Sequence, residues 1–312
     1  MSHFTVLVIG NDVEKQMQPY HEYECTGIED EYVVDVNMND EVKEYLDREL
    51  FVGVSKETGK LDYHYHQERA DESLVDHKVM SQLDFFKFKG LTPEEIEEEI
   101  RDYHGVELKD GSWFRKTNPN AKWDWWTIGG RWSGFFKQKP GANGLAGNAG
   151  FFGEPAKIGY VDVIEKKGID FEGMFKEAED KAINEYDQTY AIIKDHPVAE
   201  SWESVRERIK NIDEARKFYH SQPRVKAFSK VNVFGDLDKY QVNREVYIQR
   251  EKDAVLSTYA IVKDSTWYSK GEMGWFAVST DTITQDEWNK KVMELIDSVD
   301  DDTLFTLVDC HI

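Results

Sequence analysis

The sequence predicts an α+β fold in which the two ends of the chain form one antiparallel, ferredoxin-like sheet. Residues 4–9 and residues 304–312 are short apolar runs next to turn-forming residues, as is typical of buried strands. Between residues 284 and 299, apolar side chains recur at helical spacing. Two further strand candidates precede that helix, so the C-terminal quarter runs strand, strand, helix, strand.

The first strand is predicted from Phe4 to Ile9 because it is a β-branched and apolar run that stops at the turn signal Gly-Asn-Asp, residues 10–12. If it pairs antiparallel with the last strand, His3 lies near His311. Cys310 would then be close by, on the opposite side of the last strand.

A capping box indicates a helix in the first half of the chain. Thr92 is followed by Glu95, proline stands at the first helical position, and Gly105 stands where such a helix would end. Farther along, apolar stripes predict helices over residues 170–195 and from Trp202 to the residues before Pro223. Together these two form an expected helical hairpin over residues 170–221.

The last quarter contains two strand candidates, residues 258–262 and residues 275–278, joined by a polar segment with the length of a hairpin connection. The helix that follows begins with a second capping box, Thr284 with Glu287.

These elements predict a discontinuous sheet domain, residues 1–36 with residues 255–312. The expected insertion, residues 37–254, contains a tryptophan-rich segment (residues 113–136) and the helical hairpin. The glycine-rich stretch of residues 141–153 suits a mobile loop, and it lacks the Lys-Ser/Thr pair of a phosphate-binding loop. The sequence leaves open whether the sheet domain and the insertion pack together as one compact unit.

Composition restricts the classes of partner. The chain has 312 residues, a net charge of −22 and a pI near 4.8, which disfavours non-specific binding of duplex nucleic acid. Two cysteines can close at most one disulfide, so reduced thiols are expected. Neither a leader peptide nor a run of about 18 apolar residues is recognisable, so we expect a cytoplasmic protein without a membrane partner.

The segment of residues 115–139 contrasts with this acidity, because it holds six basic residues, one acidic residue, four tryptophans and three glycines. Strand alternation would place Trp123 and Trp125 on one face and Trp126 on the other. The glycine pair that follows permits a bulge that sets Arg131 beside Trp132. The candidate ligand- or partner-binding residues are Lys122, Trp123, Trp125, Trp126, Arg131 and Trp132. The alternative is an interior tryptophan cluster.

A second candidate site is the segment of residues 19–25, which gathers residue types used for metal binding and acid–base catalysis. Its candidate catalytic residues are His21, Glu22, Glu24 and Cys25. On a strand, the two glutamates would share one face and the other two residues the opposite face, so the set needs help from elsewhere. The candidate metal ligands are His3, His21, Cys25, Cys310 and His311. A zinc site, a Cys–His nucleophile pair, and simple buried or hydrogen-bonded side chains all stay open.

Several strings resemble a family of proteins encoded by bacteriophages and by bacterial genomes as prophage genes. They are MSHFTVLVIG at the start, TNPNAKWDWW and GGRWSGFFK in the centre, and GEMGWFAVS and LVDCHI near the end. The resemblance implies a viral or prophage origin. It implies no activity, cofactor or catalytic residue.

Three functions are compatible with the sequence. The first is a non-enzymatic phage accessory protein that binds a host protein, for host take-over or counter-defence. The second is an enzyme or binder of a small ligand, with a nucleotide-like molecule held over the tryptophan-rich segment and chemistry supplied by His21, Glu22, Glu24 and Cys25. The third is an acidic mimic of nucleic acid. The cofactor is left unknown.

Overall fold

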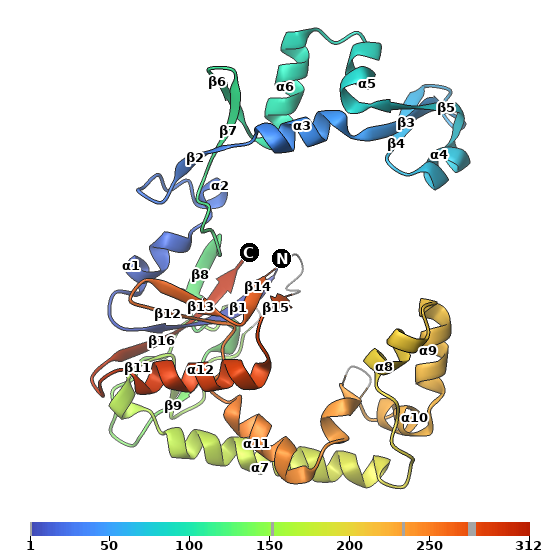
Figure 1. The fold of residues 1–312 in the computed structure, drawn as a ribbon. Coiled ribbons are helices and arrows are strands. Elements are labelled where there is room, and N and C mark those ends of the chain that lie inside the picture. The colour runs from blue at the N-terminus through green and yellow to red at the C-terminus, as the bar shows by residue number, and fades with distance from the viewer. Residues whose placement is uncertain (1, 151–152, 233–234, 274–278) are drawn as a thin grey trace. The chain divides into compact units, whose positions relative to one another are not determined.

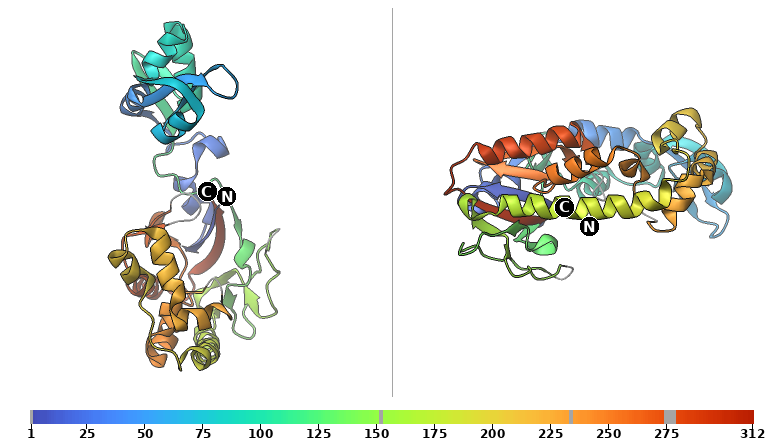
Figure 2. Two further views of the ribbon diagram at one scale, coloured as in Figure 1. Left: turned by 90° about the vertical axis from the view of Figure 1, so that its right-hand side faces the viewer. Right: turned by 90° about the horizontal axis from the view of Figure 1, so that it is seen from below.

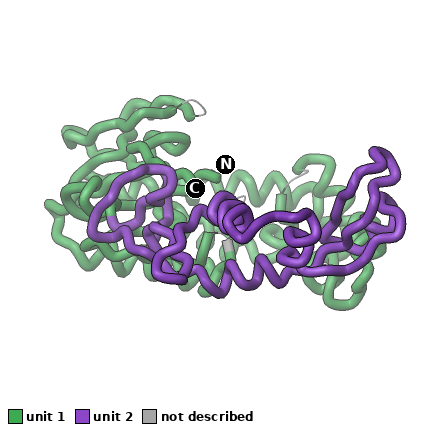
Figure 3. The backbone as a smooth tube through the Cα atoms, turned by 90° about the horizontal axis from the view of Figure 1, so that it is seen from above, with its two compact units in different colours: residues 1–18, 125–312 green, residues 19–124 purple. Residues whose placement is uncertain are grey.

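The computed structural model describes residues 2–150, 153–232, 235–273 and 279–312 as an α+β protein (Figure 1). It contains two compact units, unit 1 with residues 1–18 and 125–312, and unit 2 with residues 19–124 (Figure 3). This division differs from the expected boundaries after residue 36 and before residue 255. The reason is that the chain from Trp125 onward contributes strands and helices to the same sheet and core as the two chain ends.

The main sheet of unit 1 is built around the first and last strands. β1 (His3–Ile9) pairs antiparallel with β16 (Leu304–His311), and His3 lies opposite His311, as predicted from the sequence. On its other edge β1 pairs in parallel with β12 (Ala260–Lys263). The α+β class is therefore observed, but the antiparallel ferredoxin-like arrangement is not confirmed, because these two neighbouring strands run in the same direction.

The sheet is completed on both sides. β13 (Thr266–Ser269) forms a hairpin with β12, while β11 (Val163–Glu165) and β8 (Trp125–Ile128) both pair with the outer edge of β16. The hairpin is tighter than the sequence suggested, since only Asp264 and Ser265 separate its strands and both have positive φ. The expected strand at residues 275–278 lies outside the described residues.

The core cluster that contains α12 lies on one face of this sheet, while Val6 and Val8 of β1 are fully buried on the other. α12 (Gln285–Asp297) begins at the predicted capping box and packs Trp288, Val292 and Ile296 against Leu7 of β1. The indole N–H of Trp288 donates a hydrogen bond of 2.7 Å to the backbone oxygen of Thr258. This pairing removes the usual cost of burying an indole nitrogen.

α7 (Phe171–Ile193) is the long helix of unit 1; α11 (Arg244–Asp253) lies alongside it, and three shorter helices gather near its C-terminal end (Figures 1 and 2). These three are α8 (Trp202–Arg208), α9 (Ile212–Ser221) and α10 (Pro223–Ser229). The second helix of the expected hairpin is thus two helices, because Ile209 is extended and Asn211 caps α9.

Shorter elements connect these parts of unit 1. They are α1 (Val13–Met17), η2 (Gly130–Trp132), β9 (Phe136–Lys137), β10 (Tyr160–Val161), η3 (Lys166–Gly168), η4 (Leu237–Tyr240), β14 (Gly271–Met273) and β15 (Ser279–Asp281). The glycine-rich stretch packs closely where it is described. A Cβ on Gly147 would lie 2.2 Å from the backbone oxygen of Ile128, and Leu145 forms a bridge with Val163. Glycine is needed there for close approach of two backbones.

Unit 2 has two small sheets and cores of its own. One sheet has the order β2–β7–β6 and the other β4–β3–β5. The strands are β2 (Val34–Asn37), β3 (Glu49–Ser55), β4 (Leu61–His64), β5 (Leu74–Ser81), β6 (Glu107–Lys109) and β7 (Ser112–Thr117); the helices are η1 (Gln18–Tyr20), α2 (Tyr23–Thr26), α3 (Asn39–Asp47), α4 (Gln67–Ser73), α5 (Gln82–Phe88) and α6 (Pro93–His104). The capping box of α6 and its glycine end at Gly105 are both observed.

Within the part of the chain that the structure describes, no helix combines the length and apolar character needed to cross a bilayer.

Candidate functional site

The core face of the unit 1 sheet changes character towards the end of β16. Phe305 and Leu307 belong to the apolar core. Asp309 and His311 continue the same face because alternate residues of a strand point to the same side. His3 of β1 lies opposite His311 and joins this face. Polar groups therefore replace apolar ones at the end of the sheet where both chain termini lie (Figure 1).

His3 and Asp309 form a hydrogen-bonded pair. The Nδ1 atom of His3 lies 2.8 Å from Oδ1 of Asp309, and Asp309 is buried. The second oxygen, Oδ2, accepts a hydrogen bond of 2.9 Å from the backbone N–H of Arg131. Because a carboxylate accepts and does not donate, the contact makes Nδ1 the donor and leaves Nε2 as the basic nitrogen of the neutral ring.

Two aromatic rings fix the plane of the His3 ring. Trp125 stacks on His311 with centroids 5.2 Å apart and an angle of 13° between the rings. His3 meets Trp125 edge-on at 5.2 Å and 79°, and it meets His311 at 5.0 Å and 78°. The pairing of β8 with β16, which places Trp125 opposite His311, brings these rings together.

The glycine pair after β8 wraps around two buried aspartates. Gly130 has a φ of +57°, and a Cβ there would lie 2.2 Å from Oδ2 of Asp309. Gly129 approaches Asp162 in the same way, at 2.7 Å. Asp162 accepts hydrogen bonds from the hydroxyl of Ser133 and from three backbone N–H groups, those of Gly134, Phe135 and Gly147. The glycines thus let the backbone come close enough to satisfy both carboxylates.

A pocket of about 860 Å³ adjoins the His3–Asp309 pair within unit 1. His3 and Trp132 line it together with Tyr247 and residues before β12 and at the start of α12. Its charged wall residues are Lys239, Arg250, Lys270, Glu251 and Asp286. Basic residues outnumber acidic ones here, whereas the whole chain has 61 acidic and 39 basic residues. The pocket therefore favours an anion more than the average surface does.

The candidate binding residues of the tryptophan-rich segment are divided between the units. Lys122 and Trp123 belong to unit 2, whereas Trp125, Trp126, Arg131 and Trp132 belong to unit 1. Trp123 is 6% exposed, while Trp125 and Trp132 are 45% and 38% exposed. The expected strand that would place Trp123 and Trp125 on one face is not observed, because β8 begins only at Trp125. The indole environments consequently differ.

Two basic residues of the same segment pair with acidic side chains of their own unit. Lys116 pairs with Glu29 at 2.7 Å in unit 2. Lys137 pairs with Glu177 at 2.5 Å in unit 1, and the pKa of Lys137 is raised, chiefly by that hydrogen bond. These contacts offset the local excess of positive charge that the sequence suggested.

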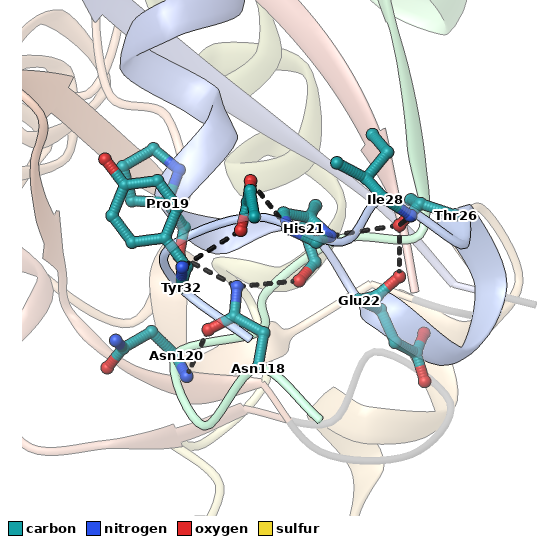
Figure 4. Close-up of polar contacts among 9 residues, drawn as sticks. Pro19, His21, Glu22, Thr26, Ile28, Tyr32, Asn118 and Asn120 are labelled. Atoms are coloured by element: carbon teal, nitrogen blue, oxygen red, sulfur yellow. Dashed lines mark hydrogen bonds and ion pairs between the residues drawn. The ribbon is translucent and has the colours of Figure 1, made fainter. Parts of the chain in front are cut away.

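His21 is held in the interior of unit 2 (Figure 4). Its Nδ1 lies 3.0 Å from Oγ1 of Thr26, and its Nε2 lies 3.3 Å from a carboxylate oxygen of Asp30. The buried amide of Asn118 donates hydrogen bonds to the backbone oxygens of Pro19 and His21, at 3.0 and 2.9 Å. Nδ1 of His21 is thus hydrogen-bonded, and Nε2 lies at ion-pair distance from Asp30 without a hydrogen bond in the described structure, which fits a structural role.

The neighbours of His21 form part of a helical turn, since residues 23–26 form α2. The expected strand geometry of Glu22, Glu24 and Cys25 is therefore wrong. Potential ligand atoms of Glu22, Cys25 and Asp124 lie within 4.8 Å of one another, so these residues could hold a metal ion. The pKa of the exposed Cys25 thiol is raised by burial of the sulfur and by Glu22, which makes it a poor nucleophile.

The other candidate metal ligands lie in unit 1, where His3 and His311 are neighbours and Cys310 is separate from them. Cys310 is fully buried and pairs with Phe4. Strand alternation directs it to the face opposite His311 and His3. Asp309, Asp124 and the basic pocket residues Lys239 and Arg250 were not among the candidates predicted from the sequence. The signal for Asp309 was its place two residues before His311 on a predicted strand.

Comparisons of the chain with family models, with curated proteins and with solved structures find no match.

Proposed function

We propose that unit 1 binds a small anionic ligand that carries a flat ring, of which a nucleotide is the simplest example. The observation that carries this proposal is the convergence of an exposed indole, three basic side chains and His3, which is held by Asp309, on one pocket. Ligand pockets in proteins have volumes of roughly 300–1,000 Å³, and this pocket lies within that range.

The ring of the ligand is assigned to Trp132, which lines the pocket and is 38% exposed. Stacking of a base on an aromatic side chain contributes about 1–3 kcal/mol and tolerates different bases. The phosphates are assigned to the basic side chains. Arg250 is the strongest candidate because a guanidinium binds a phosphate through two parallel hydrogen bonds, whereas Lys270 also lies 3.1 Å from Asp281.

The proposal is tested by calorimetric titration of the full chain with the magnesium complexes of the four ribonucleoside triphosphates. Arg250→Gln is expected to weaken binding about tenfold or more, as loss of a charged hydrogen bond of about 1.5–3 kcal/mol implies. Arg216→Gln is the matched control, because Arg216 is an exposed arginine of α9 that does not line the pocket. Absence of binding at millimolar nucleotide, or equal affinity of both variants, would contradict the proposal.

A second candidate function is that of a phage or prophage accessory protein that binds a host protein in the cytoplasm without catalysis. The exposure of Trp125 and Trp132 favours it, since tryptophan is enriched at the centres of protein interfaces. The test is copurification from host cells. The wild-type chain is expected to retain one host protein in stoichiometric amount, and the Trp125→Ala variant is expected to lose it. Retention of that protein by the variant would count against the role of this surface. Mimicry of nucleic acid has no comparable support in the geometry.

A further inference from the structure

We infer that His3 is a catalytic base that activates a water molecule for hydrolytic removal of the terminal phosphoryl group of the bound ligand. This inference rests on the proposed function, because it requires the phosphorylated ligand to occupy the pocket that His3 lines. It concerns neither His21 nor Cys25, the residues from which the sequence suggested catalysis.

The first argument is the preorganisation of the His3 ring. Its Nδ1 is bound to Asp309, and two rings contact it edge-on. A base needs a fixed tautomer and a fixed orientation, and a carboxylate on Nδ1 supplies both. His21 shows the contrast, because its ring is fully buried and does not line the pocket.

The second argument is the fixed position of the carboxylate itself. Asp309 accepts a hydrogen bond from the backbone N–H of Arg131. The carboxylate occupies space beside Gly130 that the Cβ of any other residue would fill. The carboxylate therefore has one oxygen for the backbone and one for His3. We assign Asp309 as a positioning residue, since it acts through His3 and does not itself line the pocket.

The third argument is the charge of the wall that His3 shares. Lys239 and Arg250 line the same pocket, together with Glu251 and Asp286, and the two basic side chains can stabilise negative charge that develops on phosphate oxygens. A base beside two such side chains suits attack on a phosphoryl group.

The reaction balances with water as the only co-reactant. Nε2 of His3 takes a proton from water while the water oxygen forms a bond to phosphorus. The bond between phosphorus and the leaving oxygen breaks, and the leaving oxygen takes the proton from the His3 imidazolium. The products are inorganic phosphate and the ligand with one phosphate fewer, and the ring of His3 is neutral again.

The experiment measures release of inorganic phosphate from the four ribonucleoside triphosphates, supplied as magnesium complexes, alongside their binding. His3→Asn removes the base but keeps a donor that can reach Asp309. We expect kcat to fall about 10²-fold or more while nucleotide affinity changes less than about threefold. Asp309→Asn is expected to lower kcat with KM unchanged, which separates positioning from a merely structural role. Circular dichroism confirms that each variant is folded, and His3→Gln is the replacement should His3→Asn fail to fold.

The outcomes separate the two proposals. Nucleotide binding without phosphate release by the wild-type chain, or a wild-type kcat in His3→Asn, overturns the catalytic inference and leaves the binding function standing. Absence of binding overturns both. A contaminating phosphatase is recognised because its activity would be independent of the substitutions at His3 and Asp309.

Discussion

At the scale of single residues, buried carboxylates organise the candidate site. Asp162 receives four hydrogen bonds from the segment after β8 and from the glycine-rich stretch, and Asp309 receives one from Arg131 and one from His3. A buried carboxylate is costly unless such bonds satisfy it. The sequence predicted a binding role for the tryptophans and basic residues of this segment. The backbone that carries Arg131 and Trp132 is positioned by hydrogen bonds to these two aspartates.

Gly130 provides the sharpest test at this scale. Gly130→Ala would combine a positive φ with a Cβ 2.2 Å from Asp309. Gly141→Ala is the matched control, because Gly141 also has a positive φ, +83°, but nothing lies within 4 Å of an added Cβ. We expect the free energy of unfolding to fall by about 1 kcal/mol in the control and by a further 1–3 kcal/mol in Gly130→Ala, as overpacking costs in other proteins. Denaturant titration measures both. Equal losses would mean that Asp309 moves aside without cost.

At the scale of elements, local sequence signals predict where a helix begins, but they do not predict whether a long apolar stripe forms one helix or two. Both predicted capping boxes are present, at the starts of α6 and α12. The helix expected from Trp202 onward is divided, although its apolar side chains keep helical spacing throughout. Asn211 accepts hydrogen bonds from the backbone of Asp213 and Glu214, and this alternative to a continuous helix starts α9.

The two capping boxes allow a matched pair of substitutions. Thr284→Ala and Thr92→Ala each remove the hydroxyl that accepts from the third residue of the helix, so each should cost about 1 kcal/mol. Thr→Ser at either position keeps the hydroxyl and is the control. Hydrogen exchange should show faster exchange in α12 for the first variant and in α6 for the second. Unchanged exchange in the helix that carries the alanine would show that its cap contributes nothing.

At the scale of the whole molecule, each compact unit has its own core. The core clusters of unit 2 contain Val42, Ile100 and Leu50, all from residues 19–124, and the main cluster of unit 1 joins both chain ends with α12 and the chain after β8. A unit with its own core can fold as a separate cooperative element.

We therefore predict that residues 19–124, produced alone, unfold cooperatively in denaturant. Ile100→Ala should destabilise this fragment by about 2–4 kcal/mol because Ile100 is buried in its core. In the full chain the same substitution should shift only one of two unfolding transitions, as followed by calorimetry. A fragment without cooperative unfolding would show that unit 2 depends on unit 1.

The sequence alone determined what depends on neighbours along the chain. It predicted the terminal strands, the facing of His3 and His311, both capped helices and the α+β class, because alternation and capping are local properties of the backbone.

Only the tertiary structure decided what depends on distant partners. It paired β1 in parallel with β12 and added strands from the chain beyond residue 124 to the sheet that contains both termini. It also brought Asp309 into contact with His3 and buried His21. Those contacts join residues up to 306 positions apart, and the free energy that selects them comes from burial and hydrogen bonding across the fold, which no short stretch of sequence records.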